Sequence, residues 1–321
     1  MDLRYQPNDH PLSWEELRRR PAQEPTADVP EELQAIGRVP GPPHPKEIQF
    51  LERSASVDAE PLELPGLRPD WVGESVLPER VKFPQPPPRV QHRGVELDPL
   101  SIFEPDDRKI YFDTNVPWGC VCRITNAAGR IGSGVLIGAR HVLTASHVVE
   151  WSPRPELIEV LFAGTTSRAS AFDTNAIAFT HISGDPTSST VDEDYAVLVT
   201  NERLGERFGA LGVKTYDSAW DGDDVWTTMG YPGDPPRFNS TQPTFQKQKA
   251  LDEDAWDLGS GRAMTTTADA MVGQSGSPMF GTWSNGRFAV AVISAGGGGD
   301  NWCSGGSDLT RLVAQARRDF P

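Results

Sequence analysis

Short apolar segments separated by glycine-containing turns dominate the chain after about residue 100. Four of them are rich in β-branched or aromatic residues, which favours strands: residues 120–124, 157–162, 225–229 and 288–293. Residues 132–147 predict two more strands joined by a turn at 138–140. Residues 309–318 instead place apolar side chains at helical spacing. The pattern predicts an all-β fold followed by a C-terminal helix.

The first hundred residues have a different composition. They hold 18 of the 29 prolines and only five of the 30 glycines, and proline clusters at 40–43 and 84–88 favour extended, irregular structure. Ser13 and Glu16 form the pattern of a capping box, which predicts a short helix there, and a second is expected over residues 31–36. Three interpretations of this extension stay open: a loosely wrapped tail, a pro-segment that restrains the rest of the chain, and a docking arm for a partner.

The net charge of −15 opposes nucleic-acid binding, because phosphate contacts supply most of that affinity and need a basic surface. An anionic membrane surface is disfavoured for the same reason. Residues 1–7 lack a continuous apolar stretch, so neither a secretory signal peptide nor a transmembrane helix is expected. Localisation stays open between the cytoplasm and export by another route.

No metal or other cofactor is expected. The acidic run at 252–257 lacks the spaced oxygen ligands and turn glycine of a calcium loop, and His141 and His147 are too isolated from other ligands to indicate zinc. Three cysteines allow at most one disulfide, or three buried thiols: Cys120, Cys122 and Cys303.

Residues 273–278, with the sequence GQSGSP, place Ser275 between glycines in a tight loop. Several hydrolases present a nucleophilic hydroxyl in this way. A serine hydroxyl is a weak nucleophile without a base to take its proton and a third group to orient that base. The sequence must therefore supply both partners.

His147 is the candidate base, because it lies at the end of the predicted hairpin. Asp194 is the candidate orienting carboxylate, because it leads into the apolar residues 196–199 and would lie at the mouth of a buried strand. Its neighbours Asp192 and Glu193 are expected to be solvated.

The order His147, Asp194, Ser275 is that of chymotrypsin rather than of subtilisin or the α/β-hydrolases. The motifs around these residues resemble the three signatures of the trypsin/chymotrypsin-like serine peptidases: residues 144–147, 194–198 and 273–278. Other segments are most similar to the bacterial glutamyl endopeptidase-like branch: residues 103–109, 113–114, 117–118, 230–234 and 269–275. The resemblance covers roughly residues 101–321.

This resemblance implies a chymotrypsin fold of two six-stranded antiparallel β-barrels. The first barrel would cover about residues 101–203, and the second barrel with the C-terminal helix about 204–321, which leaves residues 1–100 as the Pro-rich extension. It also implies a serine endopeptidase that hydrolyses protein or peptide substrates through an acyl-enzyme. Relatives in this branch are largely exported.

The resemblance assigns roles to individual residues. His147 would take the proton of Ser275, Asp194 would stabilise the imidazolium, and the amides of Gly273 and Ser275 would bind the oxyanion. A glycine at 273 has no Cβ to keep its amide out of the oxyanion hole. Gln274 replaces the aspartate that pairs with a freed amino terminus in trypsin-like zymogens, so activation by that ion pair is not expected.

The specificity pocket is assigned to four residues: Asp269, Ser294, Ala295 and Gly296. Asp269 lies six residues before Ser275, where trypsin-like enzymes bind Arg or Lys, but glutamyl endopeptidase-like relatives also carry an aspartate there. A structural role for Asp269 is therefore the alternative. Relatives that cleave after Glu use a histidine in the flanking strand, and residues 292–296 contain none.

A different class of function also stays open. The chain would then be a non-catalytic or latent binding module on a protease fold, regulated by its N-terminal arm. An active peptidase predicts labelling of Ser275 by a fluorophosphonate, whereas a binding module predicts none and a partner retained by residues 1–100.

Overall fold

The computed structural model of the chain describes residues 10–33, 41–52, 61–78, 81–82, 102–103, 105–161, 168–234, 238–253, 261–297 and 299–321. Parts of the sequence predictions lie outside these residues: position 40 of the first proline cluster, the cluster at 84–88, positions 34–36 of the second expected helix and positions 254–257 of the acidic run.

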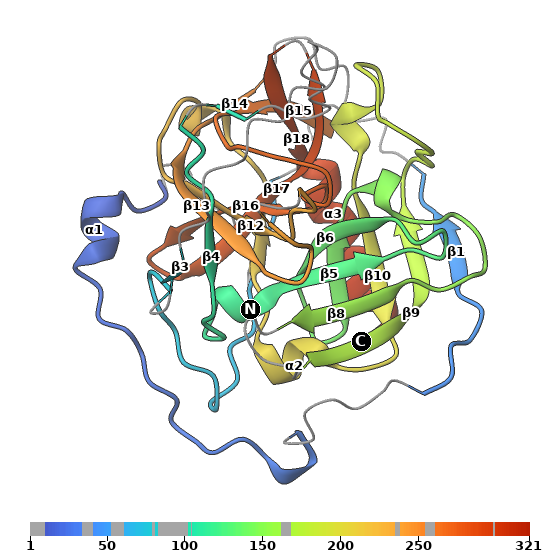
Figure 1. The fold of residues 1–321 in the computed structure, drawn as a ribbon, viewed down its shortest axis with the longest axis horizontal. Coiled ribbons are helices and arrows are strands. Elements are labelled where there is room, and N and C mark those ends of the chain that lie inside the picture. Colours follow the sequence, from blue (N-terminus) through green and yellow to red (C-terminus); the bar gives the residue numbers. More distant parts are fainter. Residues whose placement is uncertain are drawn as a thin grey trace.

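Six antiparallel strands close into a barrel, drawn in green and yellow in Figure 1. They are β5 (Val121–Thr125), β6 (Ile131–Leu136), β7 (His141–Thr144), β8 (Leu157–Leu161), β9 (Arg168–Ala178) and β10 (Ala196–Thr200). Their order is β9-β10-β7-β6-β5-β8, and β8 pairs with β9 to close the ring. β-Branched side chains suit the pleated strand, and Ile124, Val135 and Ile158 fill the core with no exposed surface.

The second sheet contains eleven strands. They are β2 (Glu63–Leu64), β3 (Val81–Lys82), β4 (Lys109–Tyr111), β11 (Gly212–Lys214), β12 (Trp226–Gly230), β13 (Thr244–Lys249), β14 (Leu251–Glu253), β15 (Gly261–Thr266), β16 (Pro278–Trp283), β17 (Gly286–Gly297) and β18 (Asp300–Gly306). The sheet is larger than the six strands expected: residues 204–321 contribute eight strands, β11 to β18, and β2, β3 and β4 join them from earlier in the chain. Its core holds a tryptophan cluster, in which Trp220 and Trp283 meet edge to face at 5.3 Å between ring centroids.

The described helices are α1 (Trp14–Arg18), α2 (Leu204–Phe208) and α3 (Ser307–Asp319), with 3₁₀ turns η1 (Glu31–Leu33), η2 (Trp118–Cys120), η3 (Ser146–Val148), η4 (Val191–Glu193) and η5 (Ser218–Trp220). The predicted C-terminal helix is thus confirmed, and Leu309, Leu312 and Val313 bury its apolar face. No helix within the described part of the chain is long and apolar enough to cross a bilayer.

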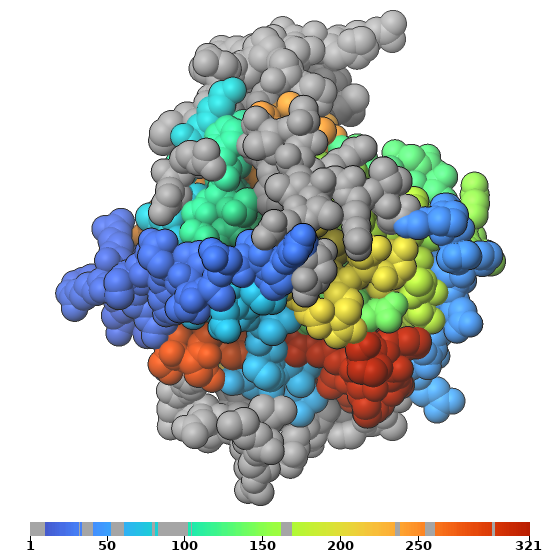
Figure 2. Space-filling model, turned by 90° about the horizontal axis from the view of Figure 1, so that it is seen from below, coloured from blue at the N-terminus to red at the C-terminus, as the bar shows by residue number. Residues whose placement is uncertain are grey.

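The described part of the N-terminal extension contacts both sheets. The predicted helix after Ser13 is α1, and its capping box with Glu16 is formed. β1 (Glu47–Phe50) pairs in parallel with β9, while β2 pairs with β11 and β3 with β4. Residues 10–33 run across one face of the molecule beside residues 61–78 (Figure 2), and Gln23 and Glu74 exchange backbone hydrogen bonds there.

Buried ion pairs link this extension to the sheets. Lys46 is 3% exposed and contacts the carboxylates of Glu156 and Asp173, the latter at 3.5 Å. Two further pairs have the opposite polarity, with the cation in the second sheet and the carboxylate in the extension: Lys214 with Glu63 and Arg287 with Glu74. A buried charge without its partner costs several kcal/mol, so these residues fix where the extension lies.

The three cysteines are buried free thiols, so the alternative of one disulfide is wrong: Cys120, Cys122 and Cys303. Burial raises the pKa of each thiol above its usual value. A buried neutral thiol is a poor nucleophile, so none of the three cysteines is expected to be reactive.

Candidate active site

His147 and Asp194 meet because two neighbouring strands place them at the same edge of the barrel. His147 follows β7 in η3, Asp194 precedes β10, and Thr144 pairs with Ala196 in the antiparallel ladder. The carboxylate accepts two hydrogen bonds from His147: Oδ1 from the backbone amide at 2.9 Å and Oδ2 from Nδ1 at 2.6 Å. An ionised carboxylate only accepts, so Nδ1 is the donor, and in the neutral imidazole the lone pair then lies on Nε2.

Asp194 accepts a third hydrogen bond, from the second sheet. Ser294 Oγ on β17 donates to Asp194 Oδ2 at 2.5 Å. Both side chains are buried, with exposed fractions of 2% and 0%. The carboxylate is therefore held from both sheets, and Ser294, predicted only as a wall of the specificity pocket, has a second contact that its position in the sequence did not reveal.

Ser275 lies in the loop before β16, and the backbone there needs glycine on both sides. Gly273 has φ +92° and Gly276 has φ +84°, in the left-handed region that side chains disfavour. A Cβ on Gly273 would lie 2.5 Å from the carbonyl oxygen of Tyr231. Among the described residues, the amides of Gly273 and Ser275 donate to no protein acceptor. They are thus available to an incoming oxyanion.

A cavity of about 430 Å³ brings the expected site residues together. Its lining includes the expected catalytic residues His147 and Ser275, the oxyanion glycine Gly273, and the expected pocket residues Ser294, Ala295 and Gly296. No hydrogen bond joins Ser275 Oγ to His147 within the described part of the chain. Such bonds often tighten only with substrate bound. The cavity is large enough for a peptide side chain beside the two groups.

Ser133 binds the loop that carries Ser275, a contact for which the sequence contained no specific signal. Its hydroxyl donates to the Gly273 carbonyl at 2.7 Å and accepts from the Tyr231 amide at 2.8 Å, while its own amide donates to the Ser275 carbonyl at 2.8 Å. Ser133 is on β6 in the closed barrel. One buried serine therefore fixes the loop to the opposite sheet.

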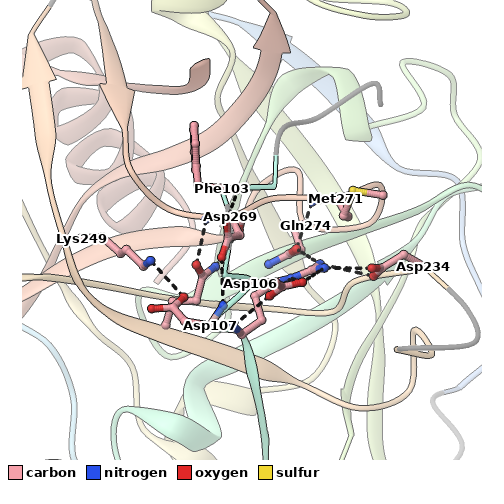
Figure 3. A network of polar contacts seen from close by, with 10 residues as sticks. Phe103, Asp106, Asp107, Asp234, Lys249, Asp269, Met271 and Gln274 are labelled. Atoms are coloured by element: carbon pink, nitrogen blue, oxygen red, sulfur yellow. Dashed lines mark hydrogen bonds and ion pairs between the residues drawn. The ribbon is translucent and has the colours of Figure 1, made fainter. Parts of the chain in front are cut away.

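Asp269 does not line the cavity. Its carboxylate, 1% exposed, accepts from the amides of Phe103 at 2.6 Å and Asp107 at 3.2 Å (Figure 3). Burial raises the pKa of Asp269 to about 6, although the two amides act against it. These contacts support the structural role that the sequence left as an alternative.

Two other polar side chains, Glu193 and His141, are buried. Glu193, expected to be solvated, is 5% exposed and accepts a hydrogen bond from Thr180, so that prediction is wrong. His141 is buried against α3, where its Nε2 lies 3.1 Å from the Ala316 carbonyl and burial lowers its pKa to about 4. No group of three or more metal-ligating side chains occurs among the described residues.

Comparisons with known proteins fit this geometry. Residues 132–291 match the family model of the trypsin-like peptidase domain. A solved Glu endopeptidase in complex with MPD matches with 20% identity and a TM-score of 0.55, over 68% of this chain and all of the other. Protease Anisep from Arthrobacter nicotinovorans matches with 19% identity and a TM-score of 0.47, over 61% of this chain and 95% of the other. No curated protein sequence matches the chain.

The chain therefore carries a trypsin-like peptidase domain, the domain of the trypsin/chymotrypsin-like superfamily, over residues 132–291. Its chymotrypsin-like fold, predicted from the sequence, is confirmed, and a Glu endopeptidase is among its structural neighbours. At this level of identity the likeness concerns the fold.

Proposed function

We propose that this chain is a serine endopeptidase that uses Ser275 as nucleophile, His147 as general base and Asp194 as the orienting carboxylate. The observation that carries the proposal is the double hold of Asp194 on His147 beside the cavity that Ser275 lines. Asp194 binds both the ring Nδ1 and the backbone amide of His147, so the imidazole has one orientation and Nε2 points in one direction.

The reaction follows from these positions. Nε2 of His147 takes the proton of Ser275 as Oγ attacks the substrate carbonyl, and the amides of Gly273 and Ser275 donate to the oxyanion. The imidazolium, stabilised by Asp194, then gives its proton to the leaving amine, and the acyl-enzyme forms. Water next transfers a proton to His147 and attacks the ester carbonyl. Return of the proton to Ser275 releases the acid and restores the enzyme.

The alternative of a protease kept silent by its N-terminal extension is less well supported. None of the described residues before Asn126 lines the cavity. The described extension lies instead on the outer strands and on one face of the molecule. We therefore propose that the enzyme acts with its extension in place.

Labelling by a fluorophosphonate tests the proposal. We expect the wild type to be labelled, and Ser275→Ala and His147→Ala to lose labelling while remaining folded by circular dichroism. Ser284→Ala, an exposed serine in the β16–β17 turn, is the control and should react like the wild type. A folded wild type that is not labelled, before or after trimming near residues 100–104, would favour the binding module instead.

A further inference from the structure

A polar network lies beside the nucleophile loop (Figure 3). At its centre is Arg108, whose side chain is 1% exposed. The guanidinium contacts Asp106 at 2.7 Å and Asp234 at 2.9 Å, and donates to Gln274 Oε1 at 3.0 Å. It also lies over the ring of Phe238, with its central carbon 4.5 Å from the centroid. The cation is thus compensated and fixed in orientation.

Gln274 connects this network to the backbone of the oxyanion hole. Its Oε1 accepts from Arg108 and also from the Met271 amide at 3.0 Å. Its own amide donates to the Met271 carbonyl at 2.9 Å. Residues 271–274 therefore form a turn closed by both the backbone and the side chain of Gln274. Gly273, with φ +92°, lies inside that turn.

The segment that carries Arg108 also anchors the start of the loop. The backbone amides of Phe103 and Asp107 donate hydrogen bonds to the Asp269 carboxylate. Lys249 forms an ion pair with Asp107 at 2.9 Å. The chain before β4 thus binds the loop at two points: Asp269, which precedes the turn, and Gln274, which is its last residue.

We propose that Arg108 is a positioning residue: acting through Gln274, it holds the amides of Gly273 and Ser275 in oxyanion-binding geometry in the uncleaved chain. The inference rests on the proposed serine peptidase function. A guanidinium suits this task because it stays charged and presents several donors in one rigid plane. The cation that orders the loop comes from inside the chain, so no freed amino terminus is needed for it.

Paired substitutions test the inference. Arg108→Met and Gln274→Met should each reduce kcat and the rate constant of fluorophosphonate labelling by about tenfold or more, with KM changed less than about threefold. If Arg108 acts through Gln274, the double variant should be about as slow as the slower single variant. Gln274→Glu keeps an acceptor oxygen for Arg108 and should stay close to the wild-type rate, and Arg108→Lys should restore part of it.

Arg287→Met is the matched control. Arg287 is also a buried arginine, 5% exposed and paired with Glu74 at 3.2 Å, but it lies in the β16–β17 turn region rather than next to Ser275. The control should lower the melting temperature without changing the labelling rate. All rates are measured well below each variant's melting temperature.

Each outcome decides one question. Folded Arg108→Met and Gln274→Met variants with wild-type labelling rates would overturn the inference and leave the proposed function intact. A wild type labelled only after removal of residues 1–100 would overturn activity in the uncleaved chain. A wild type never labelled would overturn the proposed function itself. If Arg108→Met does not fold, the neutral Gln274→Met variant decides, since it leaves the ion pairs of Arg108 with Asp106 and Asp234 in place.

Discussion

Ser294 and Asp194 share a hydrogen bond of 2.5 Å that crosses from one sheet to the other. The acceptor, Oδ2, is the same oxygen that holds Nδ1 of His147. The position of the expected general base therefore depends on how the two sheets meet, and the following predictions separate that dependence from general stability.

Ser294→Ala should reduce kcat about tenfold with little change in KM. A hydrogen bond to a charged group contributes about 1.5–3 kcal/mol, and about 1.4 kcal/mol corresponds to tenfold in rate. Steady-state kinetics on a peptide substrate selected from a library measures kcat and KM separately. Ser75→Ala, which removes a serine hydroxyl from Asp113 at 3.0 Å elsewhere, is the control. Equal kcat for Ser294→Ala and the wild type would contradict the role.

Gly273→Ala should lower kcat by about a hundredfold or more. The new Cβ would meet the Tyr231 carbonyl at 2.5 Å, so the turn must move and the oxyanion loses a donor. Gly129→Ala is matched in conformation, with φ +80° and open space around it. That control should cost about 1 kcal/mol of stability and leave kcat unchanged. The comparison fails if both variants lose activity equally.

Asp269 should make the folded state less stable as pH rises from about 4 to about 6. Its folded pKa is raised to about 6 from the model-peptide value of 3.8, so the folded state binds more protons in this window and unfolding becomes easier with rising pH. Asp269→Asn removes this dependence. Urea unfolding at pH 4 and 7 should show the wild type losing on the order of 3 kcal/mol relative to the variant. A constant difference would show that the carboxylate titrates normally.

Asp269→Asn should also leave the residue preference unchanged. The carboxylate is bound to the amides of Phe103 and Asp107 and does not line the cavity. The ratio of kcat/KM for substrates with Arg and with Ala before the scissile bond should therefore stay within about twofold of the wild type. A large fall in that ratio would place Asp269 in the pocket.

Lys46→Met should destabilise the protein by about 3–5 kcal/mol. Burial and the neighbouring Glu156 raise the pKa of Asp173 to about 9, so Lys46 balances the single remaining carboxylate charge. Thermal melting at pH 7 measures the loss. Arg19→Met, in an exposed pair with Glu15, should change stability by less than about 1 kcal/mol.

Local patterns in the sequence predicted much of the fold. The strand expected at 157–162, the hairpin at 132–147 and the C-terminal helix each depend on side-chain periodicity within one segment. Each is confirmed, the strand as far as residue 161, the last described residue there. The short strands β2 and β3 have only two residues each. A segment of two residues shows no periodicity, so these strands could not be recognised from the sequence.

Contacts between distant segments explain what the sequence could not predict. Glu193 is buried because its turn, η4, packs on β15 and β18, and it accepts a hydrogen bond from Thr180. Asp269 binds an amide 166 residues earlier, and Ser294 binds a carboxylate 100 residues earlier. Spacing along the chain contains no information about such pairs until the sheets are assembled.

The pairing of β1 with β9 has a consequence for how the chain is made. Lys46, just before β1, binds Glu156, which is 110 residues further along the chain and is made later. During synthesis the first-made segment must therefore wait, unpaired and carrying a charge destined for burial, until the barrel strands have left the ribosome. Until it docks, the edge of β9 at residues 175–178 can pair with another molecule. This part of the extension is thus translated before its partner strand, and its docking covers an edge that could otherwise pair with another molecule.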